Sequence, residues 1–221
     1  MENIARNFLA IETKIDKVCQ LYKKDKSKIK LIAVSKMQNV DKIHQAIACG
    51  CKIFGENYVK EAQEKWPEIR QKYPEIELHF IGHLQSNKVK EALEIFDVIQ
   101  TLDSEKLALL FKKEIIKQQK NPQFFIQVNI GQEQQKSGLE PNEVKDFVNF
   151  ARQDCALNIV GLMTIPPNNE SAAPYFALLN KIAQENNLKN LSMGMSADFE
   201  EAIALGSNYV RIGSAIFGER K

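Results

Sequence analysis

Apolar and polar positions follow two patterns along the chain, which together predict a repeating order of strands and helices. Near the start, apolar residues recur at alternating spacings of four and three positions from Ile4 to Leu21, as in a helix with one buried face. We therefore expect a helix over about residues 2–24. Beyond it, short apolar or β-branched runs are followed by polar turns and by helical patterns that end in Gly, Asn or Pro.

Eight of these short runs are candidate strands, at 30–35, 52–55, 77–81, 97–102, 123–129, 158–164, 190–194 and 208–212. Helix boundary signals agree with them, since Asp41, Ser104 and Ser171 suit helix N-caps and Gly50 and Gly206 suit helix ends. Strands that alternate with helices predict a parallel sheet, and eight units fit a closed α/β barrel of the TIM (β/α)8 type. We expect this barrel over about 30–218, in a single domain spanning 1–221. The alternative, a doubly wound open sheet, needs a glycine fingerprint after the first strand, and residues 35–39 include no glycine.

Composition narrows the class of protein. A chain of 221 residues that is 44% hydrophobic can bury one sizeable core. The formal net charge of +2, with Lys and Glu interspersed, argues against nucleic acid as a partner. The N-terminus has no apolar segment typical of a secretory signal, and no run approaches the roughly 20 apolar residues that span a bilayer. The four scattered cysteines suit a reduced compartment, so we expect a cytoplasmic protein without membrane partners.

Candidate chemical groups fall at the ends of the predicted strands. In a closed parallel barrel these ends form one mouth, which would gather Lys36, Asn57, His83, Ser196, Arg211 and Ser214. Lys36 closes the first apolar run, and burial there would favour the neutral amine that forms a Schiff base. A strand-terminal lysine that simply reaches solvent is the alternative.

Two turns near the end of the chain suit the binding of phosphate. Gly213 and Ser214 directly follow the last predicted strand, where the backbone can approach an anion and the hydroxyl adds a donor. Ser196 follows the seventh predicted strand, where it either binds the same anion or acts as an ordinary helix N-cap. An amine and two phosphate turns at one mouth suggest an aldehyde cofactor that carries a phosphate.

Six ordered motifs make a resemblance specific. The chain resembles the pyridoxal phosphate homeostasis protein family over nearly its whole length, through the segments 33–36 (AVSK), 54–58 (FGENY), 79–88 (HFIGHLQSNK), 161–164 (GLMT), 193–198 (MGMSAD) and 210–218 (VRIGSAIFG). The resemblance implies a barrel of PLP fold type III, similar to the N-terminal domain of alanine racemase but lacking that enzyme's β-domain. It also implies that Lys36 carries pyridoxal 5'-phosphate (PLP) as a covalent aldimine.

The resemblance assigns further roles by position. Ser196, Gly213 and Ser214 correspond to the phosphate site, although Thr is commoner in the family where this chain has Ser214. Arg211 corresponds to the residue that faces the pyridine nitrogen, with a structural ion pair as the alternative. Asn57 either bonds the cofactor or starts a helix. His83 has no assigned role, and 136–138 is a candidate cover over the site. His44 and His79 are expected on a helix surface and in a strand, without a metal site.

These roles favour a binding protein over an enzyme. Because arginine only donates hydrogen bonds, a ring nitrogen facing Arg211 stays unprotonated and the ring is a weak electron sink. The chain ends three residues after Gly218, so we expect no second domain to supply the second base of alanine racemase. We expect a non-enzymatic monomer that buffers, carries or regulates PLP and influences amino and keto acid pools, with PLP-dependent apoenzymes as candidate recipients. A weak PLP-dependent racemase or lyase and a cofactor-free Schiff-base aldolase are the alternatives.

Overall fold

The computed structural model describes residues 4–219 and has the predicted barrel. Eight parallel strands close on themselves in chain order, and the last strand pairs with the first through Ile32 with Arg211 and Ala33 with Ile212. The strands are β1 (Lys30–Val34), β2 (Ile53–Glu56), β3 (Glu77–Phe80), β4 (Val98–Leu102), β5 (Gln123–Val128), β6 (Asn158–Thr164), β7 (Asn190–Ser192) and β8 (Tyr209–Ile212).

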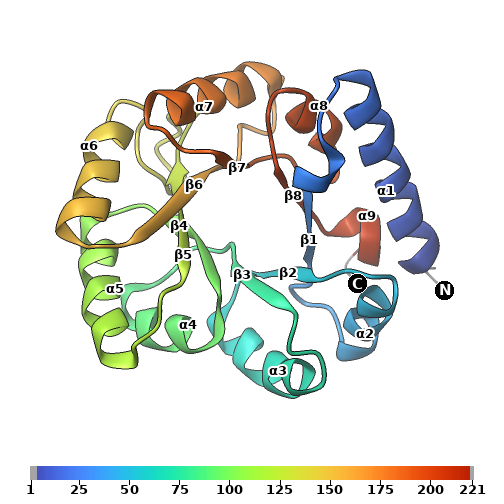
Figure 1. The fold of residues 1–221 in the computed structure, drawn as a ribbon, viewed down its shortest axis with the longest axis horizontal. Coiled ribbons are helices and arrows are strands. Elements are labelled where there is room, and N and C mark those ends of the chain that lie inside the picture. Colours follow the sequence, from blue (N-terminus) through green and yellow to red (C-terminus); the bar gives the residue numbers. More distant parts are fainter. Residues whose placement is uncertain (1–3, 220–221) are drawn as a thin grey trace.

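Helices form a ring around the outside of the strands (Figure 1). They are α1 (Ile4–Leu21), α2 (Val40–Ala48), α3 (Val59–Lys72), α4 (Val89–Ile95), α5 (Glu105–Gln118), α6 (Val144–Asn149), α7 (Ala173–Glu185), α8 (Phe199–Ala204) and α9 (Ser214–Phe217). The extra helix α1 packs against α8, α9 and α2, and Asn7 donates to the carbonyl of Ile216 at 3.0 Å. This contact ties the first helix to the short last one. Among residues 4–219, every helix is too short or too polar to cross a bilayer.

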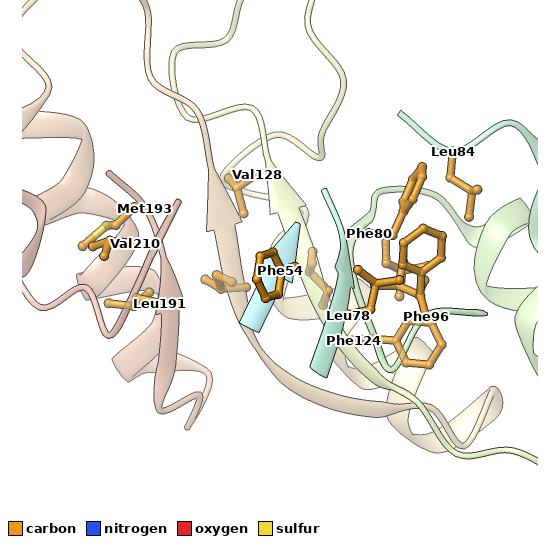
Figure 2. Packing of buried hydrophobic residues seen from close by; sticks show 14 of the residues in the cluster. Phe54, Leu78, Phe80, Leu84, Phe96, Phe124, Val128, Leu191, Met193 and Val210 are labelled. Carbon is orange, nitrogen blue, oxygen red and sulfur yellow. The ribbon is translucent and has the colours of Figure 1, made fainter. Parts of the chain in front are cut away.

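Apolar side chains fill two separate layers. The larger layer lies between the strands and the helices, where Phe80 and Phe96 meet edge to face at 5.1 Å beside Leu78 (Figure 2). The second layer lies inside the barrel and consists of Ile32, Val98, Phe125, Met163 and Tyr209. Alternation along each strand produces both layers, because successive side chains point to opposite faces.

The predicted element types are confirmed, and several boundaries are wrong. The first helix ends at Leu21 instead of residue 24, because Lys23 adopts a left-handed conformation with φ of 52° that a helix cannot continue through; positions 2 and 3 lie outside the described residues. The strand predicted at 190–194 ends at Ser192. The chain turns at Gly194, where φ is 91° and a β-carbon would lie 2.5 Å from that of Ala202. Glycine is needed there because α8 approaches closely.

Two of the three predicted N-caps are also wrong. Ser104 accepts a hydrogen bond from the Leu107 amide at 3.4 Å, as predicted. Helix α2 is capped instead by Asn39, which bonds the amide of Lys42, so Asp41 lies in the first turn. Helix α7 follows Ala172, so Ser171 lies outside the cap. Asp41 and Ser171 were plausible because acidic and small polar residues suit both the cap and its neighbours.

Candidate functional site

All six predicted binding residues line one cavity at the carboxyl ends of the strands. The cavity has a volume of about 340 Å³ and brings together Lys36, Asn57, Ser196, Arg211, Gly213 and Ser214. Lys36 follows β1, Asn57 follows β2 and Ser196 follows β7. Arg211 lies on β8, Gly213 in the turn after it, and Ser214 at the start of α9. Barrel closure brings the two ends of the chain together, since β1 and β8 are neighbours.

Lys36 lies in a tight turn after β1. Ser35 and Gln38 close this turn through a backbone hydrogen bond of 3.1 Å, and Met37 inside it has a φ of 59°. Lys36 itself is half-buried and lines the cavity, so the alternative of a lysine that merely reaches solvent does not describe its setting. The turn therefore holds an amine at the cavity wall.

A buried carboxylate supports this turn from behind. Glu56 is fully buried, and its Oε1 accepts hydrogen bonds from the Ser35 hydroxyl at 2.8 Å and from the Trp66 indole at 3.1 Å. Burial raises the pKa of Glu56, although Lys65, at 2.8 Å, opposes the rise. Lys65 also donates to the carbonyl of Ser35 at 3.0 Å. Glu56 and Lys65 thus both hold Ser35, the residue before Lys36.

Arg211 is held by neutral groups. Its Nη1 donates to the Ser192 hydroxyl and its Nη2 to the Thr164 carbonyl, each at 2.7 Å. Within the part of the chain that the structure describes, Arg211 forms no salt bridge, which argues against the structural ion pair considered above. Burial lowers the pKa of Arg211 to about 10, which the charge of Asp198 partly opposes. The guanidinium therefore stays positive at neutral pH and can only donate.

Two hydroxyls and a backbone amide meet at another part of the cavity. The Ser214 hydroxyl lies 3.3 Å from the Ser196 hydroxyl, which also accepts from the Ala215 amide at 3.4 Å. Ser196 is not an N-cap, because α8 begins at Phe199 and its N-cap position is Asp198. Gly213 precedes α9 with a φ of −115°, so it contributes backbone without left-handed strain. This group of donors suits an anion.

Asn57 belongs to the cavity rather than to a helix cap. The N-cap position of α3 is Tyr58, and the buried Oδ1 of Asn57 has no hydrogen-bond partner among the described residues. A buried amide oxygen without a partner is costly, so a ligand with an N–H or O–H group would satisfy it. The cavity therefore offers an amine, an anion site, a guanidinium and an acceptor without a partner among the described residues. These groups together fit a phosphorylated aldehyde.

Of the candidate cover 136–138, Lys136 and Ser137 line an adjoining cavity of about 290 Å³ together with His83. This cavity shares Asn57 with the first. The Nδ1 of His83 lies 3.1 Å from the Ser137 hydroxyl. His44 lies on α2 at the edge of the Tyr73 ring, and His79 is buried in β3. No group of His, Cys, Asp and Glu among residues 4–219 is arranged to hold a metal ion.

Some residues of the site were not predicted from the sequence. Gln38 lines the cavity and lies only two positions after Lys36, so its place in the same turn was a usable signal. Met195 also lines it, one position before Ser196. Thr164 and Ser192, which hold Arg211, lie on β6 and β7, and no local pattern links them to it. Only the closed barrel makes them neighbours.

Comparisons with known proteins agree with this architecture. Residues 3–221 match the family model described as alanine racemase, N-terminal domain. The pyridoxal phosphate homeostasis protein of Pasteurella multocida is 40% identical over 98% of this chain and 97% of its own length. The structure of PipY from Synechococcus elongatus, with PLP bound, is 31% identical and has a TM-score of 0.79, covering 93% of this chain and 100% of PipY.

A more distant match concerns the fold alone. Alanine racemase of Clostridium difficile is 15% identical with a TM-score of 0.75, and the match covers 99% of this chain but 57% of the racemase. The shared part is thus the barrel. The high identity and nearly complete coverage of the Pasteurella protein, with the family model matched from end to end, decide the family. This chain belongs to the pyridoxal phosphate homeostasis protein family.

Proposed function

We propose that this chain binds PLP and acts in the cytoplasm as a buffer, carrier or regulator of that cofactor. The observation that carries the proposal is the single cavity lined by Lys36, Ser196, Arg211 and Ser214. The Pasteurella relative is named for PLP homeostasis, and PipY has been solved with PLP bound. PLP, when bound, supplies an aldehyde that captures amines and a ring that accepts electrons.

Each part of the cavity would hold one part of the ligand. The hydroxyls of Ser196 and Ser214, with the Ala215 amide, would hold the phosphate. Arg211 would face the pyridine nitrogen and donate to it. Asn57 would contact the ring substituents through its unpaired acceptor. Lys36 would form a covalent C=N bond, in which its nitrogen attacks the aldehyde carbon and one water molecule leaves.

The cavity supports binding over catalysis. Of the described residues that line it, Lys36 and Arg211 are the ones with basic side chains. Arg211 keeps its proton at neutral pH, which leaves Lys36 as the base within the cavity. A single base can move a proton on one face of a bound amino acid, whereas racemisation needs a proton on each face. We therefore propose that the chain catalyses no rapid racemisation.

Transfer of the cofactor tests the proposed role. Purified protein loaded with PLP is mixed with a PLP-dependent apoenzyme, and the recovered activity is followed over time. The proposal predicts faster reconstitution than spontaneous release into buffer allows, whereas equal rates would contradict the carrier role. Incubation with L-alanine in heavy water tests the enzymatic alternative. Deuterium at the α-carbon with many turnovers would replace the binding role by a racemase or lyase.

A further inference from the structure

A chain of hydrogen bonds runs through the interior of the barrel from the cavity to the opposite end. Arg211 donates to Ser192 at 2.7 Å, and the Ser192 hydroxyl donates to Gln100 Oε1 at 2.6 Å. Gln100 Nε2 lies 2.8 Å from His79 Nδ1, and His79 Nε2 lies 2.6 Å from Glu77. These five side chains come from strands β8, β7, β4 and β3. Glu77 lines a third cavity, with Arg70 and Lys120, at the amino ends of the strands.

The interior position of these side chains is unusual for a barrel. Ser192, Gln100 and His79 are fully buried, among apolar neighbours such as Val98 and Tyr209. Barrel interiors are normally filled by branched apolar side chains, and buried polar groups destabilise the fold unless they are paired. A polar chain that crosses this interior therefore serves something other than the packing of the barrel.

The hydrogen bonds of the chain can run in one consistent direction that begins at Arg211. Because arginine has no acceptor, the Ser192 oxygen accepts from it and directs its own proton to Gln100. The Gln100 amide then donates to His79 Nδ1, which must carry a lone pair, so the ring proton lies on Nε2 and is donated to Glu77. Burial lowers the pKa of His79 despite the nearby Glu77 carboxylate, which agrees with a neutral ring. In this arrangement each hydrogen-bonding proton between Arg211 and Glu77 points to one acceptor.

We propose that Gln100 and His79 are positioning residues that fix how Arg211 presents its guanidinium to the bound cofactor ring. The inference rests on the PLP binding proposed above. Neither residue lines the cofactor cavity, so both act through Ser192. A proton on His79 Nδ1 would force Gln100 to turn its amide round. Ser192 would then face two donors and lose the acceptor for its own proton, which would loosen Arg211.

The Gln100→Met variant tests this role, because it removes both hydrogen bonds of the amide with little change in volume. Ser207→Ala is the matched control, since the Ser207 hydroxyl is also buried and its hydrogen bonds within residues 4–219 go to backbone carbonyls, the closest at 2.7 Å. PLP affinity and the pH dependence of the cofactor's absorption are measured for wild type and both variants. We expect Gln100→Met to weaken PLP binding at least about threefold and to change the absorption profile, as expected for the loss of buried hydrogen bonds. Ser207→Ala should match wild type.

Identical affinity and absorption in Gln100→Met and Ser207→Ala would overturn the positioning role. A wild-type protein that takes up no PLP would instead overturn the proposed function, and the positioning role with it. Nuclear magnetic resonance of the histidine ring nitrogens tests the chain in wild-type protein without PLP, whether or not the variant folds. We expect His79 at about neutral pH to carry its proton on Nε2 and a lone pair on Nδ1. A proton on Nδ1 would contradict the inference even if PLP binds.

Discussion

The buried ion pair of Glu56 and Lys65, which supports the turn of Lys36, leads to the sharpest prediction about stability. Lys65 is nearly buried and contacts Glu56 at 2.8 Å, Glu61 at 2.8 Å and the Ser35 carbonyl at 3.0 Å. The Lys65→Met variant keeps most of the packing but leaves Glu56 as a buried carboxylate without its counterion. Removal of one partner from a buried pair typically destabilises a protein by about 3–5 kcal/mol. We expect a loss in that range at about pH 7.5, where carboxylates are normally ionised.

The loss of stability in Lys65→Met should be smaller at acidic pH. Burial already raises the pKa of Glu56, and removal of the Lys65 charge would raise it further. A carboxyl whose folded-state pKa exceeds its unfolded value binds a proton in the folded state first, so the stability of the variant falls as pH rises through the folded pKa. At about pH 5.5 a larger share of Glu56 is protonated than at about pH 7.5, so the loss in the variant should be smaller there.

Urea unfolding at the two pH values measures these differences. Glu56→Gln in the Lys65→Met background should recover most of the lost stability, because it removes the uncompensated charge. Lys181→Met is the control, since Lys181 is 72% exposed and lies 3.9 Å from Glu185, so it should change stability by less than about 0.5 kcal/mol. A Lys65→Met loss below about 1 kcal/mol, or a loss of equal size at both pH values, would refute the reasoning.

Three further predictions concern glycine, the anion site and the cysteines. Gly161→Ala should destabilise the protein by about 2 kcal/mol or more in urea unfolding, because a β-carbon would lie 2.2 Å from a carbonyl of β7. Gly50→Ala should cost only about 1 kcal/mol, since Gly50 has a φ of 91° but open space around it; equal losses would contradict this. Ser214→Ala should weaken PLP binding about tenfold in a titration while Ser214→Thr stays near wild type, and equal affinities would argue against a hydroxyl contact to phosphate. Burial raises the pKa of Cys51 to about 12, so a thiol reagent at about pH 8 should label the half-buried Cys49 first; earlier labelling of Cys51 would be the contrary result.

The fold was predictable because its signals are local. Each strand is an apolar run of the right length, such as 158–164, and each is followed by a helical pattern, so element order alone indicates a barrel. Some of the errors lie at boundaries that tertiary contacts set. The chain leaves β7 early because α8 approaches Gly194, and no propensity of the sequence near residue 193 reports that contact.

The candidate site was predictable where it depends on strand ends and on family motifs. Lys36, Asn57, Ser196 and Arg211 line one cavity because every strand of the barrel ends at the same mouth. The groups that support them were not predictable. Ser192 and Gln100 are 92 positions apart and meet only inside the closed barrel.

Glu56 is another residue whose partner could not be predicted from the sequence. In the sequence it is one residue of a motif, and its contact with Lys65 requires α3 to pack against β2. A charged residue in an apolar strand signals that a partner exists without identifying it. Sequence patterns thus locate the residues that meet a ligand more readily than the residues that hold them in place.

Chemical trapping tests the central claim most directly. Purified protein is incubated with PLP, reduced with borohydride, digested and mapped by mass spectrometry, with Lys36→Ala treated in parallel. The account predicts a visible absorption band that disappears on reduction, and a phosphopyridoxyl group on the peptide that contains Lys36. It predicts neither the band nor the modified peptide in Lys36→Ala. A label on another lysine, or a wild-type protein that stays colourless and unmodified in excess PLP, would contradict it.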